Sequence, residues 1–269
     1  MYYTIKTISD LIGITPQTIR YYEENGVLSP KRDARNGYRY YTVWDYGILL
    51  MARRYLRYGC SVAKSSELLN NTSVERTIDA TRRQEAQLEE EIADKLRILD
   101  NLRKWRALLE AVGQGTGACR IDMRPGLFRM ENMEDTTFLP EKEIYQRTKQ
   151  WLAMTPFVFN TIRYPLEDVQ KDTCHRFSAL GILEENARLW NIQADQYVTY
   201  YPPRLCVIQT IGGEGFDTML PLSRRIGKAM SFLAEKGLSL TGDIITRMDY
   251  AQKSASGYCS YQTAWFPID

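Results

Sequence analysis

Seven side chains that can hydrogen-bond to nucleic acid lie close together between residues 18 and 41. They are Thr18, Arg20, Tyr21, Tyr22, Tyr38, Arg39 and Tyr41. An arginine pairs with a phosphate or contacts a guanine edge through two hydrogen bonds, and tyrosine hydroxyls donate to phosphate oxygens. The surrounding sequence is basic, because residues 1–70 carry ten lysines and arginines against six acidic residues, whereas the whole chain has a net charge of only +2. This chemistry suits double-stranded DNA.

Two short helices and a turn are predicted to position these side chains. Residues 8–12 form an apolar-periodic helix that ends at Gly13, and a second helix begins with Thr15 as its N-cap and Pro16 at its first position. Gly26 ends this second helix, so the pair predicts a helix-turn-helix. The following NGYRYY predicts a small β wing. Any one tyrosine could equally be half-buried packing, but the order of helix, turn and wing favours DNA binding.

The segment YTIKTISDLIGITPQTIRYYEENGVLSPKRDARNGYRYY, followed by Leu56 to Gly59, resembles the MerR family of transcription regulators. The resemblance covers residues 2 to about 70. It implies a winged helix-turn-helix dimer that binds promoter DNA with an overlong spacer between the two elements read by the RNA polymerase holoenzyme. It also implies a second wing at Gly59, which makes Arg57 a candidate contact to the DNA backbone. Arg53 and Arg54 on the same predicted helix, residues 43–58, are equally well explained as a solvated face.

Residues 75–112 predict one uninterrupted amphipathic helix, about 55 Å long at 1.5 Å per residue. Its apolar stripe follows alternating spacings of three and four residues. The stripe consists of Ile78, Leu88, Ile92, Leu99, Leu102 and Leu109. A helix of this length cannot bury such a stripe alone, so it needs a partner. Polar residues interrupt the stripe, which favours an antiparallel pair of limited overlap. We therefore expect a homodimer joined by an antiparallel coiled coil.

Residues 119–269 predict a domain of the α+β class in which strand, helix, strand and strand follow one another twice. Strands are predicted at 128–133, 157–163, 174–179, 197–201, 205–211, 241–250 and 258–266, with helices at 140–154 and 216–235. This order resembles the GyrI-like effector domain of the multidrug-sensing, BmrR/EcmrR-like branch of MerR proteins, and it implies a pocket between two pseudo-equivalent halves. The predicted organisation is a DNA-binding domain at 1–74, a dimerisation helix at 75–112, a hinge at 113–124 and an effector-binding domain with duplicated βαββ units at 125–269.

Aromatic side chains of this domain could hold a bulky lipophilic ligand through area burial and cation–π attraction. The resemblance, aligned by element order, gives the candidate ligand contacts Tyr145, Trp151, Phe157, Phe159 and Thr246. Thr246 stands where multidrug relatives place a glutamate that neutralises a bound cation. Asp249 is an odd number of steps away and could face outward. The ligand is therefore expected to be bulky and aromatic, and its charge stays open between cationic and neutral.

The apolar runs and the cysteines of the sequence indicate the cellular compartment. No apolar run approaches the roughly 18 residues of a transmembrane helix, and the first residues lack a signal-peptide core. The five cysteines are odd in number and scattered. We expect free thiols, a cytoplasmic location and no membrane partner.

Three other functions fit the sequence less well. A metal or redox sensor would cluster cysteines near the long helix, but Cys119 stands there alone and the sole histidine, His175, is distant. A GyrI-like hydrolase fused to a DNA-binding domain would use a buried acid, but no acid is paired with His175 or a nucleophile at recognisable spacing. A purely architectural DNA-bending protein would not need 150 further residues. We expect no metal, no cofactor and no catalytic residues.

Overall fold

The computed structural model describes residues 2–70, 73–113, 118–173, 175–213, 222–254 and 257–269. It divides into two compact units, Met1–Arg97 and Ile98–Asp269, and the division falls inside helix α5 (Val74–Gly113). Within the described ranges, none of the helices is both long enough and apolar enough to cross a bilayer.

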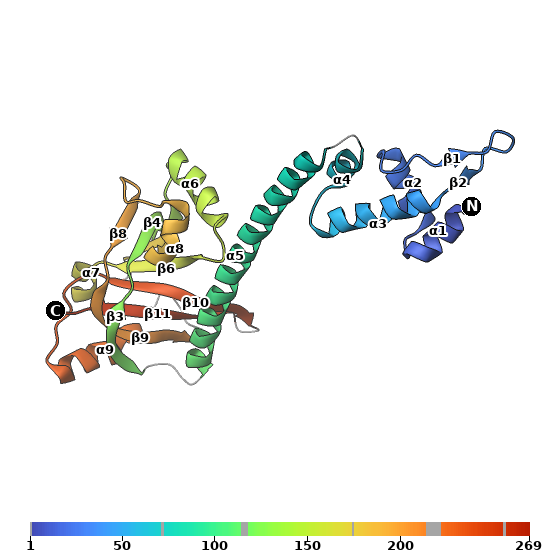
Figure 1. Ribbon diagram of the computed structural model, residues 1–269. Helices are drawn as coiled ribbons and strands as arrows, with labels where there is room; N and C mark the ends of the chain where they lie inside the picture. The colour runs from blue at the N-terminus through green and yellow to red at the C-terminus, as the bar shows by residue number, and fades with distance from the viewer. Residues whose placement is uncertain (1, 71–72, 114–117, 174, 214–221, 255–256) are drawn as a thin grey trace. The chain divides into compact units, whose positions relative to one another are not determined.

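The first unit is a helix-turn-helix with a two-stranded wing, as the sequence predicts (Figure 1). Its elements are α1 (Ile5–Ile12), α2 (Pro16–Glu24), β1 (Lys31–Arg32), β2 (Arg39–Tyr40), α3 (Val43–Arg57) and α4 (Val62–Leu69). The hydroxyl of Thr15 caps α2 by accepting from the backbone N–H of Thr18, and Gly13 ends α1 in the left-handed conformation. Ile8, Ile19 and Leu49 are fully buried and hold the helices together.

Helix α5 is continuous over 40 residues, and none of them is buried in the single chain. The six stripe residues face solvent to different degrees, from half-exposed Ile78, Leu88, Ile92 and Leu102 to the partly covered Leu109. An amphipathic helix with an uncovered stripe is a surface that binds another helix.

The described part of the second unit forms a nine-stranded antiparallel sheet in the order β3-β9-β11-β10-β6-β7-β4-β5, with β8 also paired to β4. The strands are β3 (Cys119–Arg124), β4 (Leu127–Glu134), β5 (Thr137–Phe138), β6 (Val158–Tyr164), β7 (Phe177–Leu183), β8 (Val198–Tyr201), β9 (Arg204–Gly213), β10 (Ile244–Ser254) and β11 (Gly257–Pro267). The helices are α6 (Lys142–Leu152), α7 (Leu166–Gln170), α8 (Glu184–Ala187) and α9 (Leu222–Lys236), with a 3-10 turn η1 (Arg188–Trp190).

The predicted duplication is present in the topology. The unit β4-α6-β6-β7 and the unit β9-α9-β10-β11 each contribute three neighbouring strands, and the two halves join where β6 pairs with β10. Two expectations need correction. Residues 119–124, assigned to a hinge, form β3, because their backbone groups pair with those of β9 and extend the sheet by an edge strand. The strand expected at 174–179 begins at Phe177 and ends at Leu183. Outside the described residues lie positions 114–117 of the predicted hinge, Cys174, and positions 216–221 at the start of the second predicted helix.

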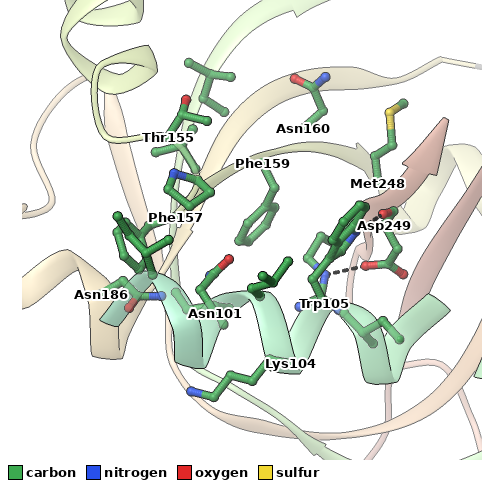
Figure 2. A pocket seen from close by; sticks show the side chains of 18 of the residues that line it. Asn101, Lys104, Trp105, Thr155, Phe157, Phe159, Asn160, Asn186, Met248 and Asp249 are labelled. Atoms are coloured by element: carbon green, nitrogen blue, oxygen red, sulfur yellow. Dashed lines mark hydrogen bonds and ion pairs between the residues drawn. The ribbon is translucent and has the colours of Figure 1, made fainter. Parts of the chain in front are cut away.

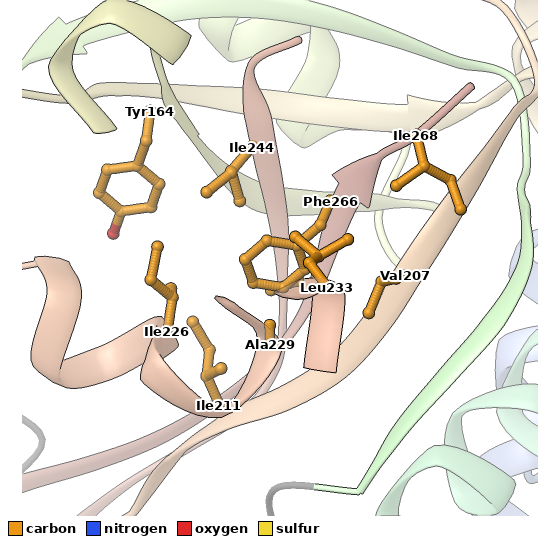
Figure 3. Close-up of a cluster of buried hydrophobic side chains, with 10 residues drawn as sticks. Tyr164, Val207, Ile211, Ile226, Ala229, Leu233, Ile244, Phe266 and Ile268 are labelled. Carbon is orange, nitrogen blue, oxygen red and sulfur yellow. The ribbon is translucent and has the colours of Figure 1, made fainter. Parts of the chain in front are cut away.

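The two faces of the sheet have different roles. One face packs on α9 through a core that includes Tyr164, Val207, Ile244 and Phe266 (Figure 3). Because side chains alternate along a strand, Thr246 lies on the same face as Ile244. The opposite face carries a second buried cluster, formed by Leu127, Cys206, Ile208, Ile245 and Trp265.

Candidate DNA-binding surface and ligand cavity

The exposed DNA-contact candidates lie on α2, at the wing and at the end of α3. Arg20 and Tyr21 are exposed on α2, and Thr18 is half-buried at its first turn. Tyr38, which is 68% exposed, immediately precedes β2 in the wing. Arg57 is exposed at the last position of α3, two residues before Gly59, whose φ of 94° makes the tight turn there. These five side chains are available to a duplex.

The other three candidates have structural partners within the unit: Tyr22 packs in its core, and Arg39 and Tyr41 bond to Glu23 of α2. Tyr22 and Tyr41 are 7% and 0% exposed, so neither ring has a surface to offer to DNA. The Tyr41 hydroxyl donates to Glu23, and Arg39 Nε donates to the same carboxylate at 2.7 Å. Burial raises the pKa of Tyr41, and the hydrogen bond to Glu23 raises it further. This burial argues against the predicted DNA contacts of Tyr22 and Tyr41, since both rings pack in the core that joins the elements carrying the exposed candidates.

Removal of the Tyr41 hydroxyl is expected to destabilise the first unit. Tyr41→Phe leaves the mostly buried carboxylate of Glu23 with one donor fewer, which costs about 1.5–3 kcal/mol for a hydrogen bond to a charged group. Urea denaturation of the full chain measures the change. Tyr40→Phe removes a hydroxyl from the neighbouring, less buried ring and serves as the control. Equal losses in the two variants would contradict this role for Tyr41.

Arg53 also has a structural partner. Its guanidinium donates to the backbone carbonyl of Ile12 near the end of α1. A helix leaves its last carbonyls without intrahelical partners, so this contact ties α3 to α1.

The second unit contains a cavity of about 680 Å³ (Figure 2). One wall is the end of α5, from Ile98 to Leu108, and the opposite wall comes from residues 152–160 with parts of β7, α8 and β10. Phe157 and Phe159 contribute aromatic surface, and Trp105 faces them from α5. The volume lies within the range of about 300–1,000 Å³ that is typical of small-molecule sites.

Asp249 enters this cavity from an irregular point in β10. The pairing of β10 with β11 shifts between Met248 and Tyr250, which leaves Asp249 as an extra residue. The indole Nε1 of Trp105 donates to the backbone carbonyl of Asp249 at 2.7 Å. Its carboxylate accepts from Arg247 Nε at 2.6 Å and from Thr263 Oγ1 at 2.5 Å. A buried acid is thus present in the cavity, and it already has two donors.

The predicted ligand contacts separate into two groups. Phe157 and Phe159 line the cavity. Tyr145 is 49% exposed on α6 and does not line it. Trp151, near the end of the same helix, is packed in a buried core cluster. Thr246 is buried, and its hydroxyl donates to Gln262 Oε1 at 2.7 Å. Three cavity residues that the sequence reasoning did not select are Trp105, Arg247 and Asp249.

His175 lies between two acids away from the cavity. Its Nε2 is 2.9 Å from Glu134 Oε1, and its Nδ1 is 3.3 Å from Asp168 Oδ2. Among the described residues, no group of three or more histidine, cysteine, aspartate or glutamate side chains is placed to hold a metal ion. The four described cysteines form no disulfide. Through its two ring nitrogens, His175 links Asp168 of α7 to Glu134 at the end of β4.

The hydrogen bond to Glu134, followed by that to Asp168, raises the pKa of His175 above its ordinary value. A raised pKa in the folded state stabilises the fold most at pH values below the unfolded pKa of about 6.5, and this contribution disappears as the pH rises through the folded pKa. The melting temperature of the wild type should therefore exceed that of His175→Asn more at pH 5.5 than at pH 8.5. A difference in melting temperature between the two proteins that does not change with pH would contradict the ion pair. Because the chain has one histidine, NMR titration of its imidazole measures the pKa without ambiguity.

Comparison with known proteins adds independent information. The model of the family described as MerR HTH family regulatory protein matches residues 3–72. The HTH-type transcriptional regulator CueR of Escherichia coli O157:H7 is 31% identical over 110 residues, which covers 40% of this chain and 78% of the relative. The protein of the same name from Vibrio cholerae serotype O1 is 32% identical over 108 residues, which covers 38% of this chain and 78% of the relative.

Two solved structures are also similar. An EcmrR–DNA complex determined by cryo-electron microscopy has a TM-score of 0.38 and 13% identity, with 99% of each chain covered. HiNmlR, a MerR family regulator lacking the sensor domain and bound to promoter DNA, has a TM-score of 0.34 and 24% identity, covering 42% of this chain and 96% of that one. Both TM-scores are below 0.5, so neither likeness supports an inference about this chain.

The residues matched by the family model include the helix-turn-helix, its wing, α3 and α4. The E. coli relative is more than 30% identical over more than two thirds of its own length. The chain therefore belongs to the MerR family of DNA-binding transcription regulators.

Proposed function

We propose that this regulator is a ligand-responsive transcription activator that works as a homodimer. Two first units, joined through an antiparallel pairing of α5, bind a promoter whose spacer is overlong for the RNA polymerase holoenzyme. A bulky aromatic lipophile in the cavity of a GyrI-like effector domain favours the dimer arrangement that kinks and untwists the spacer. The two promoter elements are then aligned for the polymerase.

One observation carries this proposal: the cavity wall is built partly from α5 itself. Ile98, Leu102, Trp105 and Leu108 line the cavity, and the same helix carries the uncovered stripe that favours a partner helix. A ligand that enters the cavity therefore meets the dimerisation helix directly, without an intermediate element.

Two polar contacts fix α5 to the rest of the second unit. Trp105 Nε1 donates to the Asp249 carbonyl at 2.7 Å, and Lys104 Nζ donates to Glu185 Oε1 at 2.9 Å. Both contacts lie at the cavity, so a ligand that moves Trp105 or α8 also alters the position of α5 relative to the sheet. A movement of this kind would give the differential contact between two states that a ligand-driven population shift requires.

The exposed residues of the first unit fit the DNA-binding half of the mechanism. Arg20 and Arg57 supply charge, while Tyr21 and Tyr38 supply hydroxyls at the surface. Because such contacts go mainly to phosphates, affinity should fall steeply with salt concentration. Few side chains remain to identify bases, so specificity should depend on how easily the centre of the site deforms.

Filling the cavity with a side chain tests the proposal. Asn101 lines the cavity from α5, where Figure 2 shows its side chain directed towards the space below Phe159, and it is only partly buried. Asn101→Trp should therefore occupy the space without disturbing the core. We expect the neutral aromatic probe triphenylphosphine oxide to bind the wild type by isothermal titration calorimetry and to bind this variant far more weakly. Duplex binding without the probe should be equal for both. If the wild type binds neither this probe nor its charged analogues tetraphenylphosphonium and tetraphenylborate, the assignment of the cavity is wrong.

A further inference from the structure

Arg247 lies where an organic cation would be held. Its guanidinium carbon lies 5.6 Å from the ring centroid of Phe159 and 5.7 Å from that of Trp265. Its Nε donates to Asp249 Oδ1 at 2.6 Å. Aromatic faces and a carboxylate are the groups that bind cations in proteins, through the ring quadrupole and through charge. Here a side chain of the protein itself makes those contacts.

Both carboxylate oxygens of Asp249 already accept a hydrogen bond from the protein itself. The Asp249 side chain is 2% exposed and that of Arg247 is 15% exposed, and the second carboxylate oxygen of Asp249 accepts from Thr263 Oγ1. An arginine side chain keeps its charge at every pH at which proteins fold. Within the pair, the positive guanidinium and the negative carboxylate therefore balance each other in the cavity.

The remaining charges of the cavity also compensate one another. Among the described residues that line it, the charged ones are Arg247, Asp249, Lys104 and Glu185, and Lys104 pairs with Glu185 at 2.9 Å. A cation that entered would lie beside the Arg247 guanidinium with no unpaired carboxylate to balance it. A neutral aromatic molecule would meet apolar and aromatic walls without that repulsion.

We propose that Arg247 is a built-in occupant of a cation subsite, so that the cavity of the native protein selects neutral aromatic lipophiles over organic cations. The inference rests on the proposed function, because it assigns the ligand class of the same cavity. Removal of the guanidinium would expose the faces of Phe159 and Trp265 and leave Asp249 as a buried carboxylate without its cation. A bound organic cation would then restore the missing charge.

Arg247→Met tests this assignment, because methionine is unbranched and uncharged. Isothermal titration calorimetry on the full chain compares tetraphenylphosphonium, its anionic analogue tetraphenylborate and neutral triphenylphosphine oxide. We expect the wild type to bind the neutral probe more tightly than the phosphonium. The variant should bind the phosphonium at least about tenfold more tightly than the wild type does, with little change for the neutral probe. The phosphonium should also raise the melting temperature of the variant more than that of the wild type.

Three further variants isolate the cause. Arg247→Lys keeps a cation beside Asp249 and should show no gain. The double variant with Arg247→Met and Asp249→Asn should lose the gain, because the carboxylate is gone. Arg188→Met removes one positive charge from an exposed surface site and should leave the probe affinities unchanged. If Arg247→Met does not fold, Arg247→Gln replaces it in the same titrations.

The outcomes separate this inference from the proposed function. A wild type that prefers the phosphonium over the neutral probe overturns the inference, and so does a variant that binds the neutral probe but gains no affinity for the cation. If neither protein binds any of the three probes, the cavity is not a ligand site, and the proposed function fails together with the inference.

Discussion

Ile92→Glu is expected to abolish tight duplex binding, although the residue lies in α5, outside the candidate DNA contacts. Ile92 is 52% exposed in the middle of the α5 stripe. In an antiparallel pair of helices, each subunit would bury one such side chain, so the substitution acts twice. The loss of about 1.5–3 kcal/mol of apolar burial per side chain, added to the burial of a carboxylate without a partner, should weaken the dimer by roughly a thousandfold or more. A monomer holds only one half-site, so its affinity for the duplex falls accordingly.

Sedimentation equilibrium and a duplex-binding titration measure the two consequences. Gln87→Glu is the matched control, because it adds the same charge to the exposed side of α5 away from the stripe. It should remain dimeric and bind the duplex as the wild type does. A dimeric Ile92→Glu protein, or equal effects in both variants, would show that another surface joins the subunits.

Phe159→Ala should reduce the affinity for triphenylphosphine oxide by about 2–3 kcal/mol, which is roughly 30- to 150-fold. The ring lines the cavity and also lies under Arg247. Its removal therefore takes away both contact area for the ligand and support for the guanidinium. Phe159→Leu should lose less, since it keeps part of the apolar surface.

Tyr145→Ala gives the contrast that only the structure could supply. The sequence predicts ligand contacts at both positions, but Tyr145 is half-exposed on α6 and does not line the cavity. Titration calorimetry should find its affinity for the probe unchanged. Equal losses in the two alanine variants would mean that the ligand lies elsewhere, on the surface of α6.

The first unit could be predicted closely because its signals are local. Thr15, Pro16, Gly13 and Gly26 mark helix ends by their own backbone and side-chain preferences, and each lies at the predicted position. The burial of individual side chains was harder to predict from the sequence. The sequence places Tyr21 and Tyr22 side by side, but only packing of α2 on α3 decides that the first faces solvent and the second the core.

The cavity was harder to predict because its walls are distant in the sequence. Trp105 belongs to a helix whose pattern predicts a partner helix, and nothing local indicates that its indole bonds to residue 249. Asp249 was set aside because Thr246 was taken to face the pocket. Thr246 faces α9 instead, and since successive side chains of a strand alternate, the odd step brings Asp249 to the cavity face. A shift of one residue in alignment reverses every such assignment.

Coupling between the cavity and the DNA is the central claim, and the affinity of triphenylphosphine oxide on two duplexes tests it most directly. The duplexes share one sequence, selected for tight binding from random DNA, and one of them carries two mismatched pairs at its centre, which makes it easy to distort. If the ligand favours the distorting dimer, reciprocity requires the probe to bind more tightly on the mismatched duplex, by about fivefold or more. Equal dissociation constants on the two duplexes would contradict the account.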